Sequence, residues 1–414
     1  MNREKNVSKS RLFTSEHVSP GHPDKLADQI SDACLDAIYA VDRSLNTRVA
    51  VETMLKGNVV IIAGEVSCQK PLDIDYEAIV RQTLRNNFYT KENSPMYNDE
   101  DVIVVNLISE QSKDIAQCVN SNERKGVGAG DQGIMFGYAV DEAPDMTGWC
   151  HYLSRYLVDR IYEYFIQHIM DYETINKYFP DFKVQVTCAY DDGKVFVRDV
   201  NVSIAHEKAE TLDSVRKEVG DFVRRMMLYL AIKHDALEIA DTTYHVNANG
   251  PFTIYGPIAD TGLTGRKIVC DQYGGYAPVG GGAFSGKDLT KIDRTAAYMA
   301  RYFAQMTLRE IKQGRYYFGG TREKVRSVQC NVSYIIGDVY PVTVDFIVTF
   351  DNGETEYITA GRDIIERFSV ENMCDMFLDN IKSFEKISAR CHVGTTSAND
   401  EIKPWEFDIY GECE

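Results

Sequence analysis

Three glycine-containing stretches of the chain carry an imidazole, carboxylates and cations in close succession. They are Gly21-His22-Pro23-Asp24-Lys25, Gly262-Leu263-Thr264-Gly265-Arg266-Lys267, and Gly281-Gly282-Ala283-Phe284-Ser285-Gly286-Lys287-Asp288, the last followed by Lys291 and Asp293. Lys and Arg attract phosphate oxygens, and Mg²⁺ takes one or two carboxylates together with phosphate oxygens and waters. These residue types favour a site for a polyphosphate and magnesium, with Asp24 and Asp293 as the carboxylates.

The third stretch resembles a P-loop except at its last residue. Asp288 stands where a P-loop has the Ser or Thr whose hydroxyl holds magnesium. A glycine-rich backbone can still present several N–H groups to an anion, with Lys287 beside them. Taken alone, the stretch fits phosphate binding and a tight loop without a ligand equally well.

Two of these stretches precede predicted helices. Pro23 suits the first position of one helix, and Thr290 is the predicted N-cap of the other, with Asp293 three residues on as in a capping box. Helix N-termini attract phosphate through unpaired N–H groups and the helix dipole. For either helix alone, an acid that only complements the helix dipole is a sufficient explanation. Adjacent cations, likewise, often form a solvated surface without a ligand. Two similar starts in one chain favour a shared site.

The stretch Gly128-Ala129-Gly130-Asp131-Gln132-Gly133 matches the G-x-G-x-x-G dinucleotide fingerprint in its letters only. That fingerprint needs a strand before it and a helix after it, whereas a polar loop precedes this stretch and a β-like run, 134–140, follows. We therefore reject a Rossmann site. The glycines are expected to shape a loop, and a functional role for Asp131 is left open.

Composition places these motifs in a globular chain with an acidic surface. The chain has 414 residues, enough for two or three domains, and 44% of them are apolar. Its net charge of −17 opposes nucleic-acid binding, and its apolar runs are too short to span a bilayer. The ten cysteines lack metal-ligand spacing. We expect a cytoplasmic protein with no nucleic-acid and no membrane partner.

A succession of helix, hairpin, helix and strand recurs along the chain. The first unit has helices at 23–42 and 73–89, a hairpin of 48–55 with 59–66, and a strand at 102–108. The second has helices at 148–171 and 211–232, a hairpin of 183–189 with 194–204, and an extended segment at 242–246. The third has helices at 291–312 and 370–381 around paired strands 327–335 and 341–350. This pattern predicts an α+β fold of three pseudo-symmetric sheet-plus-helix domains.

Taken together, the motifs closely resemble the S-adenosylmethionine synthetase (methionine adenosyltransferase) family. They are 13–16 with 21–25, 128–133, 262–267 and 280–288, and the likeness runs in order from Leu12 to Pro404-Trp405-Glu406. The resemblance implies a subunit of three α+β domains with pseudo-threefold symmetry. It implies an N-terminal unit at 11–114, a mobile active-site loop at 115–127, a central unit at 128–254 and a C-terminal unit at 255–405.

The resemblance also implies an activity. Members of the family form S-adenosylmethionine from ATP and L-methionine, and then cleave the released triphosphate to phosphate and pyrophosphate. It implies two Mg²⁺ per site and K⁺ as cofactors, and a homodimer with active sites at the subunit interface, with a homotetramer as the larger assembly. Because a thioether sulfur attacks without losing a proton, the first step needs alignment and charge stabilisation rather than a general base.

Residue roles follow from the same resemblance, position by position. The catalytic positions are His22, Lys183, Arg266, Lys267, Lys287 and Lys291. The ATP-binding positions are His22, Asp181, Lys183, Phe252, Asp260, Arg266, Lys267, Ala283 and Lys287. The methionine-binding positions are Glu65, Gln111, Asp131, Asp260 and Lys291. Asp24 and Asp293 match the magnesium ligands, and Glu52 matches the potassium carboxylate.

Some positions depart from the family pattern. They are Pro20, Lys113, Cys118, Pro251, Tyr255 and Val279. The charged positions of the site survive, so these departures bear on rate, K⁺ dependence and substrate tolerance more than on the reaction type. Two other functions fit the same residues: a weakly active paralogue that serves as a nucleotide-binding regulatory or structural subunit, and a plain tripolyphosphatase or kinase.

Overall fold

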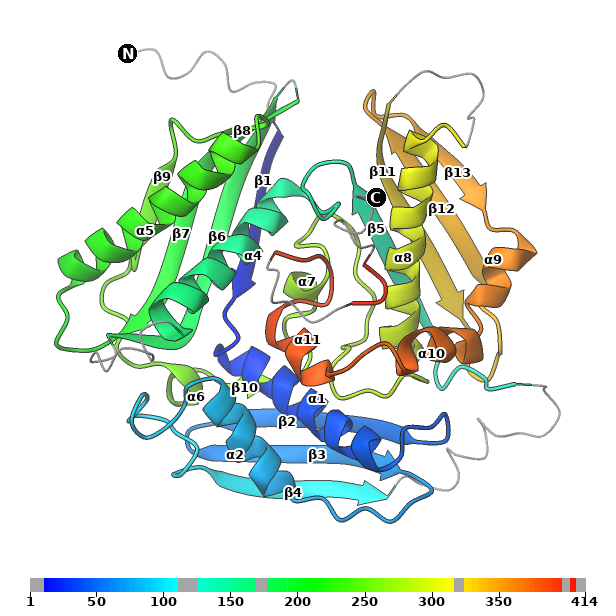
Figure 1. Ribbon diagram of the computed structural model, residues 1–414, viewed down its shortest axis with the longest axis horizontal. Helices are drawn as coiled ribbons and strands as arrows, with labels where there is room; N and C mark the ends of the chain where they lie inside the picture. The colour runs from blue at the N-terminus through cyan, green and yellow to red at the C-terminus, as the bar shows by residue number, and fades with distance from the viewer. Residues whose placement is uncertain are drawn as a thin grey trace, which may run out of the picture.

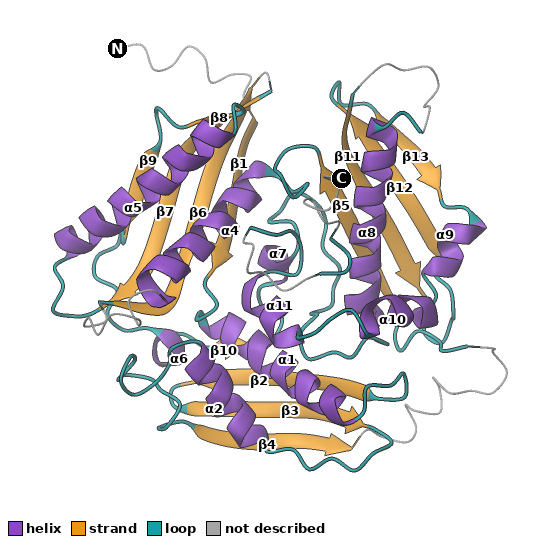
Figure 2. Cartoon of the chain, viewed as in Figure 1, coloured by secondary structure: helices purple, strands orange, loops and turns teal. Residues whose placement is uncertain are grey.

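A computed structural model describes residues 11–110, 126–167, 177–191, 193–315, 324–396 and 403–406. Three sheets lie around a common centre, and a long helix stands between each sheet and that centre (Figures 1 and 2). These helices are α1 (Pro23–Val41), α4 (Trp149–Ile161) and α8 (Ile292–Lys312). Short helices α7 (Ile268–Asp271) and α11 (Phe384–Arg390) occupy the centre (Figure 1). The predicted α+β class with three sheet-plus-helix units is confirmed.

The first sheet has the strand order β10–β2–β3–β4 and contains the predicted hairpin. Its strands are β2 (Arg48–Lys56), β3 (Val59–Ser67), β4 (Ile103–Glu110) and β10 (Gly262–Leu263). Gly57 has a φ of +57°, which a tight hairpin turn requires. Val49 and Val51 are buried on the face that α1 covers, whereas Glu52 and Met54 are exposed. Helix α2 (Tyr76–Asn86) is shorter than the predicted 73–89.

The second sheet has the order β1–β6–β7–β8, with β9 also paired to β7. Its strands are β1 (Arg11–Val18), β6 (Tyr178–Asp191), β7 (Lys194–His206), β8 (Leu237–Glu238) and β9 (Thr243–Val246). Helix α4, its π-helical continuation η1 (Tyr162–Gln167) and α5 (Leu212–Lys233) pack on it. Thr211 caps α5 by accepting a hydrogen bond from Ser214 N, as expected of a helix beginning there.

The third sheet has the order β13–β12–β11–β5. Its strands are β5 (Gly133–Val140), β11 (Val325–Tyr334), β12 (Thr343–Phe350) and β13 (Thr355–Thr359), with α9 (Arg362–Arg367) and α10 (Val370–Leu378) beyond them. Helix α8 lies very close to β5: a Cβ added to Gly137 would fall 2.0 Å from the Ala300 carbonyl oxygen. Only glycine allows this approach of helix to strand.

The sheets draw on strands from different parts of the sequence. Strand β1 precedes the first unit in the chain but pairs antiparallel with β6 of the second sheet. Strand β5 pairs with β11, and β10 pairs with β2. The three units are therefore interlocked through shared strands, and the domain limits at 11–114, 115–127, 128–254 and 255–405 stay predictions.

The long helices α1 and α8 begin in different ways. His22 is the N-cap of α1, Pro23 takes the first helical position as predicted, and the His22 Nδ1 accepts a hydrogen bond from Asp24 N at 3.1 Å. The predicted N-cap of α8, Thr290, is wrong: Lys291 holds that place without a side-chain cap. The Thr290 hydroxyl instead donates to the buried carboxylate of Asp288 at 2.6 Å.

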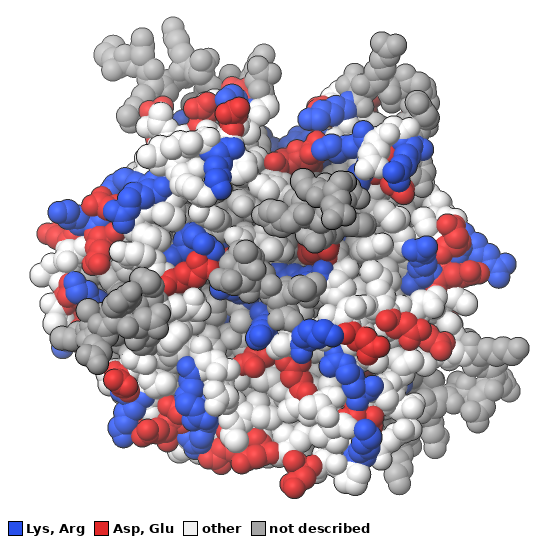
Figure 3. All heavy atoms as spheres, viewed as in Figure 1, with Lys and Arg blue, Asp and Glu red and all other residues white. Residues whose placement is uncertain are grey.

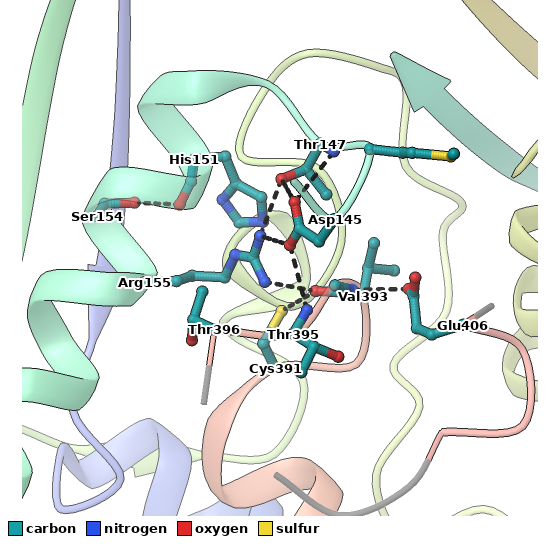
Figure 4. A network of polar contacts seen from close by, with 12 residues as sticks. Asp145, Thr147, His151, Ser154, Arg155, Cys391, Val393, Thr395, Thr396 and Glu406 are labelled. Carbon is teal, nitrogen blue, oxygen red and sulfur yellow. Dashed lines mark hydrogen bonds and ion pairs between the residues drawn. The ribbon is translucent and has the colours of Figure 1, made fainter. Parts of the chain in front are cut away.

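Buried charges tie the C-terminal segment to the helices around the centre (Figure 4). Arg155 of α4 pairs with Asp145 at 2.5 Å and donates to the carbonyl of Val393 at 3.1 Å. Arg301 of α8 pairs with Glu406 at 2.9 Å. Within the described part of the chain, no helix combines the length and apolarity that crossing a bilayer would need.

Candidate active site

One acid of α1 meets both cations of the 262–267 loop. Asp24 is fully buried, and its Oδ1 accepts a hydrogen bond from Leu263 N at 3.0 Å. Its Oδ2 lies 2.5 Å from Lys267 Nζ, and its Oδ1 lies 3.3 Å from Arg266 Nε. Arg266 is half exposed, so its guanidinium can also reach a ligand in solution. The structure thus brings the predicted carboxylate and two predicted cations into direct contact.

His22 is held neutral beside this cluster. Its pKa falls from 6.5 to about 3, mainly because burial removes water and also because nearby cations repel a second proton. Those cations are Lys267, Lys183 and Arg266, and Asp260 partly opposes them. Since Nδ1 accepts the Asp24 amide, the single ring proton lies on Nε2. His22 can therefore donate a hydrogen bond to an oxygen of a ligand while it stays uncharged.

Strand β6 supplies a buried acid and an exposed cation. Asp181 is buried and accepts a hydrogen bond from Gly256 N at 2.7 Å. Burial raises the pKa of Asp181 to about 7, against the opposing effects of the Gly256 amide and Lys183. Lys183 follows two residues on and is exposed. Phe252 lies beside His206, the last residue of β7. The Phe252 carbonyl accepts a hydrogen bond from His206 N at 2.9 Å, and Phe252 N donates to His206 Nε2 at 3.2 Å.

The P-loop-like stretch folds as an addition to the edge of the first sheet. Val51 N donates to the Gly286 carbonyl at 2.9 Å, and Lys287 forms an isolated antiparallel bridge with Ala50. Asp288 is fully buried, and its Oδ2 accepts from Val49 N at 2.7 Å. The side chain that departs from the P-loop pattern is thus occupied in fixing the loop to β2.

This stretch carries the second pair of a cation and an acid. Lys287 Nζ lies 2.6 Å from Asp293 Oδ2. A Cβ added to Gly282 would fall 2.1 Å from Asp293 Cγ, so the loop backbone lies against that carboxylate. A Cβ added to Gly265 would fall 2.5 Å from Ala283 Cβ. The two glycine loops therefore touch, so the two clusters belong to neighbouring loops of one candidate site.

The G-x-G-x-x-G stretch borders the same candidate site. It is not a Rossmann motif, because strand β5, rather than a helix, begins at its last glycine. A Cβ placed on Gly130 would lie 3.9 Å from Lys291 Nζ, and one on Gly133 would lie 3.6 Å from Asp293 Oδ1. Ala129 N donates to the Asp338 carbonyl at 2.9 Å, which fixes the loop to the turn between β11 and β12. Asp131 is exposed beside it.

Two further predicted positions belong to the strands of the first sheet. Glu52 and Glu65 are exposed on the outer face of the first sheet, opposite the face covered by α1. Glu65 is paired with Ala50, and Ala50 forms a bridge to Lys287 on its other side, so Glu65 and Lys287 lie on the same face of the sheet. Two strand spacings separate their backbones, about 10 Å. Gln111 and 115–125 of the predicted mobile loop lie outside the described residues.

Several charges behind the site are buried, which the sequence analysis did not predict. Lys25 is fully buried between Asp28 at 3.2 Å and Asp271 at 2.7 Å. Asp28 accepts a hydrogen bond from Gly265 N at 2.8 Å and so holds the loop that carries Arg266. The available signal was an aspartate at every fourth position of α1, at 24, 28, 32 and 36, which places all four on one stripe.

The surface of the molecule carries both signs of charge. Figure 3 shows Lys and Arg intermixed with Asp and Glu over the face viewed, rather than one broad patch of cations. In the parts of the chain that the structure describes, no group of three or more His, Cys, Asp or Glu could hold a metal ion. A divalent ion would need oxygen ligands from a bound phosphate, from water or from another chain in addition to a carboxylate.

Fold and site together fit a polyphosphate-handling enzyme of three α+β units, whose carboxylates come from the first turns of two long helices and whose paired cations come from two glycine loops. Family comparison agrees with this class. Residues 10–113, 126–252 and 254–406 match the N-terminal, central and C-terminal domains of S-adenosylmethionine synthetase. The S-adenosylmethionine synthases of two Staphylococcus epidermidis strains are each 36% identical to the chain over 410 residues, covering 96% of it and 95% of the relative.

The chain belongs to the S-adenosylmethionine synthetase family. Its activity is that of a methionine adenosyltransferase, as the sequence analysis predicted, and nothing favours the alternative of a regulatory or structural paralogue. The family takes ATP and methionine as substrates and is generally metal dependent.

Proposed function

We propose that both steps of the reaction take place at the junction of the two glycine loops. Methionine sulfur attacks the ribose 5′ carbon of ATP and expels triphosphate, and water then cleaves the triphosphate to phosphate and pyrophosphate. One observation carries this proposal: each candidate metal carboxylate is ion-paired with a lysine of a glycine loop, Asp24 with Lys267 and Asp293 with Lys287. The loops that carry the two lysines meet at Gly265 and Ala283.

In the first step the side chains stabilise charge rather than move protons. The thioether is already nucleophilic, and the leaving triphosphate gains negative charge that Lys183, Arg266, Lys267, Lys287 and Lys291 can balance. The Nε2 proton of His22 is placed to donate a hydrogen bond near the bond that breaks. Because its pKa is about 3, His22 remains a neutral hydrogen-bond donor at neutral pH.

Asp24 and Asp293 fit Mg²⁺ by the chemistry of their oxygens. A carboxylate with phosphate oxygens and waters is the usual ligand set of this ion. Bound there, Mg²⁺ would neutralise charge on the triphosphate, and we propose two ions per site. The loop backbone lies close to Asp293 at Gly282. A phosphate held at this carboxylate by a cation would therefore also face the loop N–H groups.

The same charges suit the second step. Water attack on triphosphate again builds charge on phosphate oxygens, so the cations that assist the first step also assist this one. ATP contacts are proposed for Asp181, Phe252, Asp260 and Ala283 in addition to the cations. Methionine contacts are proposed for Glu65, Gln111, Asp131, Asp260 and Lys291, and a K⁺ contact for Glu52.

A homodimer with sites at the subunit interface is proposed as the minimum assembly, and a homotetramer as the larger one. The support is the outer face of the first sheet, where Glu65 and Lys287 lie beside exposed apolar side chains. We also propose a cytoplasmic location, supported by free thiols at all cysteines in the described ranges.

A single incubation tests the proposed two-step reaction. Purified full-length chain is mixed with ATP, L-methionine, Mg²⁺ and K⁺, and products are measured by mass spectrometry and phosphate assay. We expect S-adenosylmethionine, phosphate and pyrophosphate in equal amounts. S-adenosylmethionine with intact triphosphate would contradict the second step, and phosphate released at the same rate without methionine would indicate a plain polyphosphatase.

A further inference from the structure

The aspartate stripe of α1 bonds to segments far away in the sequence. Each aspartate accepts a hydrogen bond from a backbone amide of another segment, and these contacts follow one another along the helix. They are Leu263 N to Asp24 at 3.0 Å, Gly265 N to Asp28 at 2.8 Å, Gly286 N to Asp32 at 2.8 Å, and Phe384 N to Asp36 at 2.9 Å. The helix thus sets the relative positions of both glycine loops.

The third acid of the stripe has a fully buried partner. Asp32 and Arg294 are both 0% exposed, and they form a bidentate pair: Nη1 to Oδ1 at 2.7 Å and Nη2 to Oδ2 at 2.9 Å. The Arg294 Nε also donates to the Tyr298 hydroxyl at 3.0 Å. The planar guanidinium fork is therefore fixed in one orientation.

This ion pair holds the chain on both sides of one peptide unit. Asp32 Oδ1 accepts the Gly286 amide at 2.8 Å, and Arg294 Nη1 donates to the Lys287 carbonyl at 3.1 Å. A Cβ added to Gly286 would lie 1.8 Å from the Val51 carbonyl oxygen, so β2 confines the peptide as well. The backbone of Lys287 has little freedom to shift relative to α1.

A buried ion pair is weak evidence for stability, because burying both charges costs about as much as their attraction returns. It is well suited to fixing geometry, however. Lys287 carries the ammonium that lies 2.6 Å from Asp293, and Arg294 is the next residue after Asp293 on α8. Arg294 is therefore connected to both members of the Lys287–Asp293 pair: it donates to the backbone carbonyl of Lys287 and is the chain neighbour of Asp293.

We propose that Asp32 and Arg294 are positioning residues for adenosyl transfer, which set the place of Lys287 relative to Asp293 and to the 262–267 loop. The inference rests on the proposed role of Lys287. Neither residue touches substrate, and both act through the backbone of 286–287. A displacement of about 1 Å in such a group can lower a rate by about 100-fold.

Arg294→Lys tests the proposal in the full-length protein, because lysine keeps the charge but loses the fork. Arg301→Lys is the matched control: Arg301 lies on the same helix, is equally buried, and pairs with Glu406 at 2.9 Å instead. Two quantities are measured for each, the kcat of S-adenosylmethionine formation per folded molecule at saturating substrates, and amide exchange of 284–288 without substrate.

We expect kcat to fall by about 100-fold in Arg294→Lys and by less than about threefold in Arg301→Lys. Exchange at 284–288 should rise only in Arg294→Lys. If Arg294→Lys does not fold, Asp32→Asn gives the same test, since it keeps one acceptor oxygen but breaks the bidentate pair. Unchanged kcat per folded molecule, or equal loss in both arginine variants, would overturn the proposal.

The proposed function and the positioning role of Asp32 and Arg294 can fail separately. If the wild-type chain forms no S-adenosylmethionine, the proposed function fails, and the exchange measurement still decides whether the pair holds the 286–287 peptide. If the wild type and Arg301→Lys are both active and Arg294→Lys matches them, the function stands and the positioning role is wrong.

Discussion

Lys267 Nζ lies 2.5 Å from Asp24 Oδ2 in the first turn of α1, and the same relationship recurs in the first turn of α8, where Lys287 Nζ lies 2.6 Å from Asp293 Oδ2. Each lysine comes from a glycine loop. Within each pair the lysine neutralises the carboxylate. Under the proposed function, phosphate oxygens of a nucleotide would become the partners of the lysines and a cation that of the carboxylates, so that neither charge would be left uncompensated.

Replacement of Lys287 by methionine should abolish most of the activity without unfolding the chain. The apolar stem keeps its packing, while the charge that opposes the leaving triphosphate is lost. We expect kcat for S-adenosylmethionine formation to fall by about 10²- to 10³-fold, the effect of removing one charge-stabilising group. Lys312→Met is the control, since Lys312 is exposed and pairs with Asp141 at 2.6 Å on the far end of α8. Equal activity of the two variants would remove Lys287 from the site.

Two adjacent glycines should respond very differently to alanine. A Cβ on Gly282 would lie 2.1 Å from Asp293 Cγ, whereas a Cβ on Gly281 would meet no atom within 4 Å. Gly282→Ala must displace the carboxylate or the loop, so we expect S-adenosylmethionine formation to fall by about tenfold or more. Gly281→Ala should stay within about threefold of wild type. Steady-state rates at several Mg²⁺ concentrations provide the measurement, and a Gly282→Ala enzyme with normal rates and Mg²⁺ dependence would contradict the proposed placement of Asp293.

The neutral state of His22 should make the folded protein sensitive to acid. Its folded pKa is about 3, below the ordinary 6.5, so the unfolded chain takes up a proton first and stability is lost as pH falls below 6.5. Between pH 7.5 and 5.5 this effect amounts to about 1.4 kcal/mol. His22→Asn lacks the titrating group. As pH falls from 7.5 to 5.5, its free energy of unfolding in urea should therefore rise relative to that of the wild type by about the same amount. A constant difference between the two proteins would show that His22 is charged, or solvated, in the fold.

The sequence predicted well those helices and hairpins in which one face is buried and the opposite face is exposed to water. Helix α1 and the β2–β3 hairpin fall within a residue or two of the expected bounds, because their apolar periodicity and the glycine turn are local signals. Strand β1 had no such signal. It completes a sheet with β6, which lies over 160 residues away, and no local pattern specifies a partner at that distance.

The candidate site was predicted from charged residues in or near glycine-containing stretches, and its assignment stays a prediction. Asp24 does meet Lys267, and Asp293 meets Lys287. These pairs could not be predicted from the sequence, because they depend on which loops pack together. Asp32 and Arg294 were missed because polar residues on a helix usually face water, whereas these two are fully buried and satisfy each other. The choice of Thr290 as N-cap failed because its hydroxyl donates to the buried Asp288 carboxylate, and the helix begins one residue later, with Lys291 at the N-cap.

A charge placed on the outer face of the first sheet should separate the subunits of the proposed dimer. This face exposes a group of apolar side chains, which supports its proposed role as the subunit interface. They are Met54, Ile103, Val105, Leu107 and Leu263, and Leu107 is 60% exposed. Leu107→Glu buries an unpaired carboxylate in any interface formed there, at a cost of several kcal/mol.

Light scattering coupled to gel filtration measures the outcome. We expect wild type to elute as a dimer or larger, and Leu107→Glu to shift to monomer with a loss of S-adenosylmethionine formation. Ile232→Glu is the matched control, because Ile232 is 74% exposed on α5, away from the first sheet. If Leu107→Glu remains dimeric, or if it becomes a monomer with full activity, the site does not depend on this face, and Glu52 and Glu65 lose the role proposed for them.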